Sequence, residues 1–324
     1  MPIIPSEFKP AWWLPGGHAQ TLWAGLLRRR VLPPLTRERV ELEDGDFIDL
    51  IWSGPAGGQI VLLLHGLEGG LHSHYVGGIM RQLNRRGFRA CLMLFRGCGE
   101  EPNRLPISYH SGKTDDPQRI LEHIRSSRRR QVYAAVGVSL GGNLLLKWLG
   151  EQGSRSPLVK AVALSVPFLL DDAARRLQQG LSRVYQRHLI ASLKTRYRRK
   201  FSRIPTPLTV QLEQITSFYQ FDDQITAPLH GFAGVEDYYR RCSSRQFIAS
   251  IRVPTLILHA RDDPFMFTDT PPGEAELPAN VWLELTQGGG HAGFVSGIIP
   301  GWADYWAEQR IAQWLADSSD RLSC

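Results

Sequence analysis

Short apolar runs alternate with longer segments of helical periodicity along most of the chain. The apolar runs, which predict buried strands, are residues 59–64, 89–95, 132–138, 158–166, 255–260 and 281–286. Segments with helical periodicity are residues 74–86, 115–128, 140–149 and 303–316. Because strands that alternate with helices form parallel sheets, the sequence predicts an α/β fold with a mostly parallel central sheet flanked by helices.

Three segments depart from this alternation. Residues 37–42 and 47–52 alternate around an Asp-Gly turn, which predicts a β-hairpin of edge strands. Residues 167–253 have mostly helical periodicity and are too long for a loop, so we expect a helical cap inserted within a single domain, residues 1–324. The aromatic, turn-rich segment 8–23 is too irregular for a helix before about Ala19, and we expect it to pack across the main body.

A candidate nucleophile stands where the run 132–138 stops and the next helix begins. Ser139 lies between Gly137 and Gly141 in the pattern G-x-S-x-G. A sharp turn between strand and helix needs neighbours without side chains, and it exposes the serine hydroxyl. The alternative is an ordinary turn, but the strand before and the helix after favour a nucleophile.

A serine hydroxyl becomes a nucleophile only when a base takes its proton, and the candidate base is His291 in the glycine-rich loop after the run 281–286. The run 255–260 is followed by Asp262 and Asp263, either of which could orient the histidine. We favour Asp263, which lies one residue farther along the loop. The order Ser139, Asp263, His291 is that of the α/β-hydrolase triad, whose members meet at the carboxyl ends of parallel strands.

An oxyanion hole needs two backbone N–H donors. Leu140, which follows the nucleophile, is the first candidate, and Leu67 in the loop after the run 59–64 is the second. Gly66 would permit close approach of the backbone, and His65 would support the loop rather than react. A purely structural turn is the alternative for this loop.

Composition restricts the class of protein further. The chain has 324 residues, of which 43% are hydrophobic and 21% charged, as in ordinary globular enzymes. The first thirty residues hold no uninterrupted apolar run, so we expect neither a signal peptide nor a membrane span, and a cytoplasmic location. No cofactor or metal site is predicted, because the pair His72 and His74 has no further ligand at a zinc-like spacing. Free thiols are expected at all four cysteines, namely Cys91, Cys98, Cys242 and Cys324.

The formal net charge of +7 is concentrated in residues 175–203, which hold ten Lys or Arg and no Asp or Glu. Such a segment favours contact with anions, including the surface of an anionic membrane. It leaves open a second hypothesis, a catalytically silent binding protein whose basic cap docks on anionic lipid or nucleic acid. The intact triad argues against this hypothesis, and without a nucleic-acid-binding module we expect no nucleic-acid partner.

Several longer motifs resemble those of the AB hydrolase 4 family, whose bacterial members are the YheT-type hydrolases. The resemblance covers nearly the whole chain, with Gly99 as one small departure where the family pattern has serine. The motifs that carry it are residues 17–22 (GHAQTL), 65–70 (HGLEGG), 95–104 (FRGCGEEPNR), 109–115 (YHSGKTD), 137–143 (GVSLGGN), 259–265 (HARDDPF) and 290–294 (GHAGF).

The resemblance implies a serine hydrolase of carboxylic esters, with relatives that act on acylglycerols or phospholipids. Taken with the residues, it predicts a lipase-like esterase that forms an acyl-enzyme on Ser139 and uses a small-molecule ester of short to medium acyl chain, an acylglycerol or another lipid. Thioesters remain open as substrates. Within the family motif, Arg96, Arg104, Tyr109 and His110 either shape the site or form a buried hydrogen-bond network that braces the cap, and both alternatives stay open.

Overall fold

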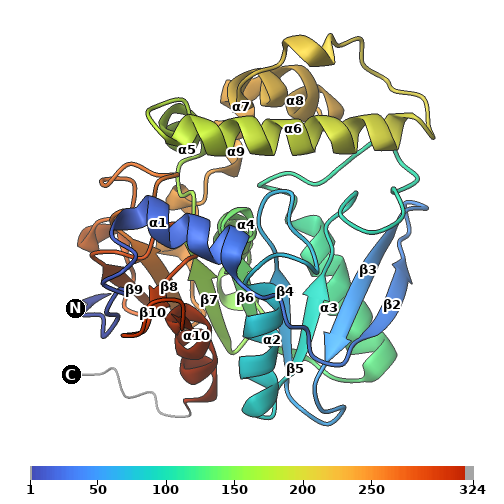
Figure 1. The fold of residues 1–324 in the computed structure, drawn as a ribbon. Coiled ribbons are helices and arrows are strands. Elements are labelled where there is room, and N and C mark those ends of the chain that lie inside the picture. The colour runs from blue at the N-terminus through green and yellow to red at the C-terminus, as the bar shows by residue number, and fades with distance from the viewer. Residues whose placement is uncertain (1, 318–324) are drawn as a thin grey trace.

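A computed structural model gives the fold of the protein and describes residues 2–317 (Figure 1). Its main feature within these residues is a nine-stranded sheet in the order β1-β9-β8-β7-β6-β4-β5-β3-β2. All neighbouring pairs are parallel except β2–β3 and β3–β5. The strands are β1 (Ile3–Ile4), β2 (Thr36–Glu41), β3 (Phe47–Ser53), β4 (Ile60–Leu64), β5 (Arg89–Met93), β6 (Val132–Val138), β7 (Lys160–Leu164), β8 (Thr255–Ala260) and β9 (Val281–Thr286). The predicted α/β-hydrolase architecture is confirmed.

Helices cover both faces of this sheet. Helices α2 (Val76–Arg85) and α10 (Trp306–Ala316) pack together on one face, and α3 (Asp115–Arg128) and α4 (Leu140–Gln152) lie on the other. The central strands β4, β6, β7 and β8 are mostly apolar, because a separate hydrophobic core covers each face of the sheet. Short 3₁₀ turns at Gly153–Arg155 and Glu274–Glu276 lie in the connections.

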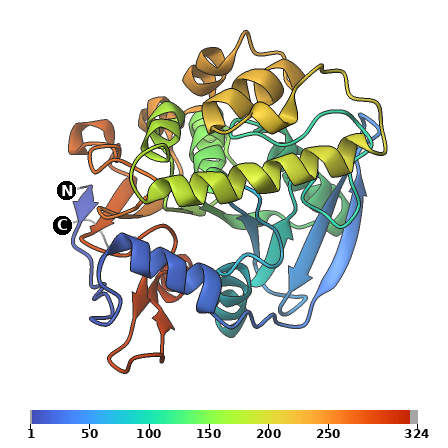
Figure 2. The ribbon, with the colours of Figure 1, turned by 45° about the horizontal axis from the view of Figure 1, so that its top comes forward.

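The segment 167–253, which we call the cap, lies over the carboxyl ends of the parallel strands (Figures 1 and 2). It has its own apolar core, which includes Leu177, Phe218, Phe221 and Tyr238. Its longest helix, α6, crosses above the sheet. The cap contains α5 (Leu170–Arg176), α6 (Ser182–Phe201), α7 (Phe218–Phe221), α8 (Ala227–Leu229), α9 (Val235–Cys242), the 3₁₀ turns Leu212–Gln214 and Arg245–Ser250, and the π-helical turn Asp222–Thr226.

The N-terminal segment differs from the prediction. Helix α1 spans Gly16–Leu22 and continues into a π-helical turn, Trp23–Leu27, so the expectation of no helix before about Ala19 was wrong. The sequence misleads because glycine disfavours helices. Here Gly17 is required by a close approach, since a Cβ on it would lie 1.8 Å from the carbonyl oxygen of Asp262.

Two further details at the edges of the sheet were not predicted correctly. Only β2 of the predicted hairpin is an edge strand, because β3 also pairs with β5. The opposite edge is the two-residue strand β1, and a small hairpin, β10 (Val295–Ser296) with β11 (Asp304–Tyr305), precedes α10, so that this helix begins at Trp306 and not at residue 303. Strands this short carry too few residues for a periodicity to be recognised.

Candidate active site

Ser139 lies at the sharp turn between β6 and α4. Its backbone has φ 53° and ψ −120°, a conformation that residues other than glycine rarely adopt. The flanking glycines are needed for space, because a Cβ on Gly137 would lie 2.3 Å from the carbonyl oxygen of Gly141, and one on Gly141 would lie 2.4 Å from that of Leu64. The turn therefore projects the Ser139 hydroxyl beyond the edge of the sheet, into a cavity.

The structure brings Ser139, His291 and Asp263 together. His291 Nε2 lies 2.9 Å from Ser139 Oγ, and His291 Nδ1 lies 2.8 Å from Asp263 Oδ2. Asp263 is only 3% exposed. Burial opposes ionisation of its carboxyl group, but the charge interaction and hydrogen bond with His291 outweigh burial and lower its pKa. An ionised Asp263 accepts a hydrogen bond from the Nδ1–H of His291, which keeps the proton on Nδ1 and leaves Nε2 free to accept the serine proton.

Asp262 has a different position. Its Oδ1 accepts a hydrogen bond of 2.9 Å from the backbone N–H of Gly290, the residue before His291. Burial raises the pKa of this carboxyl. Asp262 thus supports the loop of His291, whereas Asp263 contacts the imidazole.

Residues that the sequence analysis did not single out hold the loop of His291 from several sides. The backbone N–H of His291 donates to Thr21 Oγ1 (2.8 Å) in α1, and that of Ala292 donates to Ser165 Oγ (3.0 Å) after β7. His74 Nε2 lies 3.0 Å from the carbonyl oxygen of Ala292. Thr21 belongs to the family motif 17–22, which was the available signal.

An aromatic stack continues from His291 into the cap and α1. The ring of Phe265 lies parallel to the imidazole, with centroids 4.0 Å apart. Tyr185 of α6 contacts Phe265 (5.1 Å), and His18 of α1 stacks on Tyr185 and places its Nδ1 3.0 Å from the tyrosine hydroxyl. The stack packs on one face of the His291 imidazole and restricts its orientation.

The loop after β4 lies beside the nucleophile. A Cβ on Gly66 would lie 3.2 Å from Ser139 Cβ, so only glycine leaves the space between loop and serine open. The Leu67 N–H donates to no acceptor within the described residues, as an oxyanion donor requires. His65 is buried, which lowers its pKa to about 4. Its Nδ1 donates to Gly66 O (2.8 Å) and its Nε2 accepts from Phe95 N–H (3.1 Å), so it supports the loop.

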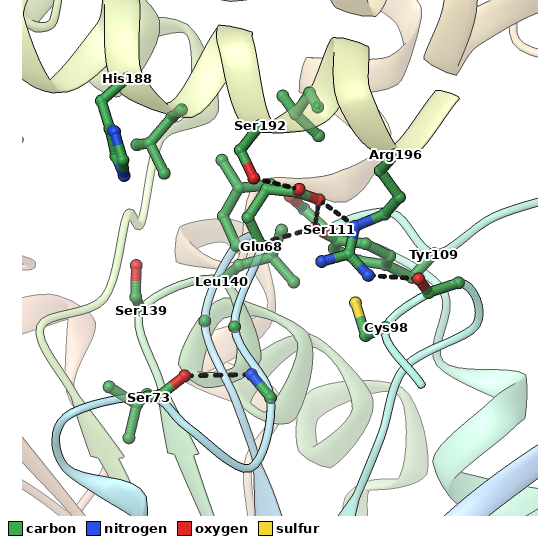
Figure 3. A pocket seen from close by; sticks show the side chains of 18 of the residues that line it. Glu68, Ser73, Cys98, Tyr109, Ser111, Ser139, Leu140, His188, Ser192 and Arg196 are labelled. Atoms are coloured by element: carbon green, nitrogen blue, oxygen red, sulfur yellow. Dashed lines mark hydrogen bonds and ion pairs between the residues drawn. The ribbon is translucent and has the colours of Figure 1, made fainter. Parts of the chain in front are cut away.

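A cavity of about 1020 Å³ separates Ser139 from the cap. Figure 3 shows Ser139 facing this space, with α6 and His188 on the opposite side. Its apolar wall comes mostly from the cap and includes Leu170, Leu177, Leu193, Phe218, Phe221 and Ile225. Leu67, Leu140 and His291 also line it. The space suits an apolar group of considerable length.

The four residues singled out in the family motifs 95–104 and 109–115 differ in their positions and contacts. Arg96 is fully buried and binds the carboxylates of Asp116, Asp46 and Asp44, so it braces the loop against α3 and the β2–β3 turn rather than against the cap. Arg104 lies outside and pairs with Glu41. Tyr109 and His110, in contrast, line the cavity.

The remaining expectations concern metals, thiols and charge. Among residues 2–317, no group of His, Cys, Asp and Glu is arranged to hold a metal ion. Cys91, Cys98 and Cys242 are free, and Cys324 lies outside the described residues.

In the basic segment 175–203, Arg183, Arg187, Arg199 and Arg203 are exposed, but Arg196 and Lys200 point inward. Burial lowers the pKa of Lys200 to about 8.

Comparison with known proteins places this arrangement in a family. The sequence model described as "alpha/beta hydrolase fold" matches residues 59–298. The chain is 41% identical to "Putative esterase YheT" of Escherichia coli (strain K12), over 98% of this chain and 96% of that protein. It is 28% identical to "Phospholipase ABHD3" of Mus musculus, over 92% and 76% of the two chains. A crystal structure of the Pyrococcus furiosus esterase Pf2001 superposes with a TM-score of 0.56 at 15% identity, covering 89% of this chain and 98% of that one.

The chain therefore belongs to the α/β-hydrolase fold family. Its similarity to YheT over nearly the full length also confirms the resemblance to the AB hydrolase 4 family and its YheT-type members. The solved structure supports the fold alone.

Proposed function

We propose that this protein is a serine esterase that transfers the acyl group of a carboxylic ester to Ser139 and then to water. Its class, a carboxylic ester hydrolase, agrees with the family and with its esterase and phospholipase relatives. The observation that carries the proposal is the unbroken hydrogen-bonded line from Asp263 through His291 to Ser139.

In the first half of the reaction, His291 Nε2 takes the proton of Ser139 as Oγ attacks the ester carbonyl carbon. The carbonyl oxygen becomes an oxyanion, which the backbone N–H groups of Leu67 and Leu140 stabilise. Asp263 stabilises the imidazolium that forms. His291 then donates its proton to the alcohol oxygen, which leaves and generates the acyl-enzyme.

In the second half, His291 takes a proton from water as the water oxygen attacks the acyl carbon, and the proton returns to Ser139 when the acid leaves. The apolar cavity under the cap would hold the acyl chain. Its volume and lining favour short- to medium-chain acyl esters, acylglycerols or other lipids. We also propose that residues 167–253 act as an inserted cap within one domain.

A fluorophosphonate probe tests this proposal, because such probes react with activated serines. The native protein is expected to take up one equivalent of probe, which peptide mass spectrometry should locate on Ser139. Heat-denatured protein is the control and should not react. The rate of hydrolysis of p-nitrophenyl esters of increasing chain length would then show how long an acyl chain the cavity accepts. No labelling, or labelling at another residue, would refute the proposed nucleophile.

A membrane surface is a second proposed partner, supported by the exposed rim of the cavity. Leu22 and Leu26 of α1 and its π-helical extension, with Val184 of α6, line the mouth and are exposed, Leu26 by 74%. On the same two helical segments, four exposed arginines form no ion pair within the described residues; they are Arg29, Arg30, Arg183 and Arg187. Exposed apolar side chains with cations nearby in the chain suit an anionic bilayer. Within residues 2–317, no helix is long and apolar enough to span a membrane.

Co-sedimentation with vesicles measures this contact. Phosphatidylcholine vesicles containing phosphatidylglycerol are expected to bind the protein, with binding that falls steeply from about 50 to about 300 mM salt as the charges are screened. Leu26→Ser should weaken binding. The matched control is Val159→Ser, because Val159 is 52% exposed just before β7, at the amino end of this strand, whereas the cap lies over the carboxyl ends. Equal binding of both variants, or binding indifferent to lipid charge, would contradict this contact.

The same experiments distinguish the esterase from the second hypothesis, a catalytically silent binding protein that docks through its basic cap. A catalytically silent protein would bind vesicles but would neither react with the probe nor hydrolyse esters. We also propose a cytoplasmic location, because a reducing compartment suits the free thiols of Cys91, Cys98 and Cys242.

A further inference from the structure

Helix α6 of the cap contacts the catalytic loops on both sides of Ser139. Tyr185, Ser192 and Arg196 are seven and four positions apart, a spacing that places all three on one face of the helix. Tyr185 contacts Phe265, which stacks on His291. Ser192 and Arg196 reach the loop that carries Leu67 (Figure 3). One helix face thus contacts both Phe265, which packs on the proposed base, and the loop of the proposed oxyanion hole.

Glu68 is the point of contact on the oxyanion side. Its side chain is only 4% exposed. Its Oε2 accepts a hydrogen bond from Ser192 Oγ (2.7 Å), and its Oε1 lies 2.8 Å from Arg196 Nε in an ion pair. The hydroxyl of Tyr109 donates to Oε1 (3.0 Å) and accepts from the backbone N–H of Glu68 (2.8 Å), so the backbone and carboxylate of Glu68 are bound by one tyrosine.

The backbone of Glu68 explains why these contacts affect the oxyanion hole. Glu68 has φ 54°, a left-handed conformation that is unfavourable for glutamate and that the surrounding bonds must maintain. Leu67 and Glu68 are the central residues of a turn that the Gly69 N–H closes by donating to the Gly66 carbonyl oxygen (3.0 Å), so the peptide plane that carries the Leu67 N–H belongs to the same turn. Without the contacts of Glu68, the turn can relax and move this donor away from the developing oxyanion.

We propose that Glu68 is a positioning residue that holds the Leu67 N–H in place through its bonds to helix α6 and Tyr109. The proposal rests on the serine esterase mechanism above. It follows that the oxyanion hole is complete only while α6 lies in the observed position, so the cap contributes to catalysis as well as to the wall of the cavity. Glu68 does not contact the reacting atoms, and its effect passes through Leu67.

The test compares two pairs of variants, Glu68→Gln with Glu213→Gln, and Arg196→Met with Arg198→Met. The control pair is matched, because Glu213 and Arg198 form an ion pair that also involves α6 but is exposed, away from the cavity. The concentration of active sites is titrated to completion with the fluorophosphonate probe. The kcat and KM for p-nitrophenyl butyrate are then expressed per titrated site, and the inhibition constant of an alkyl trifluoromethyl ketone, whose adduct with serine carries an oxyanion, is measured for each variant.

Glu68→Gln and Arg196→Met are expected to lower kcat by about 10- to 100-fold, because displacing an oxyanion donor is less severe than removing it. KM should change little. The trifluoromethyl ketone should bind more weakly in proportion to the loss of kcat/KM, since both depend on the same donor. Both control variants should match the wild type in all three measurements.

Other outcomes would overturn the proposal and leave the esterase mechanism standing. If Glu68→Gln loses thermal stability or active sites but keeps its kcat per titrated site, Glu68 is merely structural. If KM rises at constant kcat, Glu68 acts in substrate binding. If the ketone binds with unchanged affinity while kcat falls, the effect does not pass through the oxyanion. Failure of the wild type to react with the probe would instead refute the esterase mechanism.

Discussion

Replacing Ser139 by alanine is expected to lower kcat for p-nitrophenyl esters by about 10⁶-fold and to abolish labelling by the fluorophosphonate probe. Ser139 Oγ is the only atom of its side chain beyond Cβ, and it lies 2.9 Å from the base. Without it no acyl-enzyme can form, and the oxyanion donors alone leave only a small residual rate. The measurement is the steady-state rate of both proteins at equal concentration.

The fold should survive this substitution. Alanine has the same Cβ as serine, so the strain at φ 53° is unchanged, and the backbone N–H still donates to Leu164 O (2.8 Å). Circular dichroism and the thermal midpoint should therefore match the wild type. A Ser139→Ala protein that folds and retains more than about a hundredth of the activity would show that another group is the nucleophile.

Asp263→Asn is expected to lower kcat by about 10⁴-fold without unfolding the protein. Asparagine can turn its NH₂ toward His291 Nδ1, which would then become an acceptor and leave the proton on Nε2. In that tautomer Nε2 cannot accept the proton of Ser139. The rate is measured with the same ester over a range of pH, because addition of hydroxide should partly restore activity if the missing function is that of a base.

Asp262→Asn is the matched control, because the two aspartates are adjacent and both lie near the histidine loop. Asparagine at position 262 can still accept the bond from the Gly290 N–H through its carbonyl oxygen. Replacing the charged acceptor of this hydrogen bond by a neutral one should weaken the bond by about 1 kcal/mol. The expected decrease in kcat is therefore less than roughly tenfold. If kcat falls more in Asp262→Asn than in Asp263→Asn, Asp262 and not Asp263 orients His291.

The sequence predicted the central architecture well, because buried parallel strands are continuous apolar runs. The runs 132–138, 255–260 and 281–286 coincide with β6, β8 and β9. Where tertiary contacts override local preference, the prediction was wrong. Gly17 reads as a helix breaker but lies in α1, since the backbone of Asp262 leaves no room for a side chain. Strands β1 and β10 have two residues each and carry no detectable pattern.

In the candidate site, too, local sequence patterns predicted some residues, whereas residues that act through tertiary contacts were missed. That Ser139, Asp263 and His291 lie together was predictable because each follows an apolar run, and the carboxyl ends of parallel strands meet at one side of the sheet. Thr21, Phe265 and Ser165, which hold the histidine loop and its ring, were not singled out, because their roles depend on contacts between distant segments. Likewise, the basic composition of residues 175–203 did not reveal that Arg196 turns inward to Glu68.

Strand β1 and helix α1 also determine when the enzyme can become active during synthesis. Ile3 pairs with Leu283 of β9, and Thr21 holds His291, 270 positions farther along the chain. Residues 3 and 21 must therefore wait for partners 270 or more positions later in the chain, and closing so long a loop is slow. The sheet edge and the loop of the proposed base, His291, are completed in the same late step, so ester hydrolysis should report that this step is finished, and a chain that lacks β9 should remain inactive.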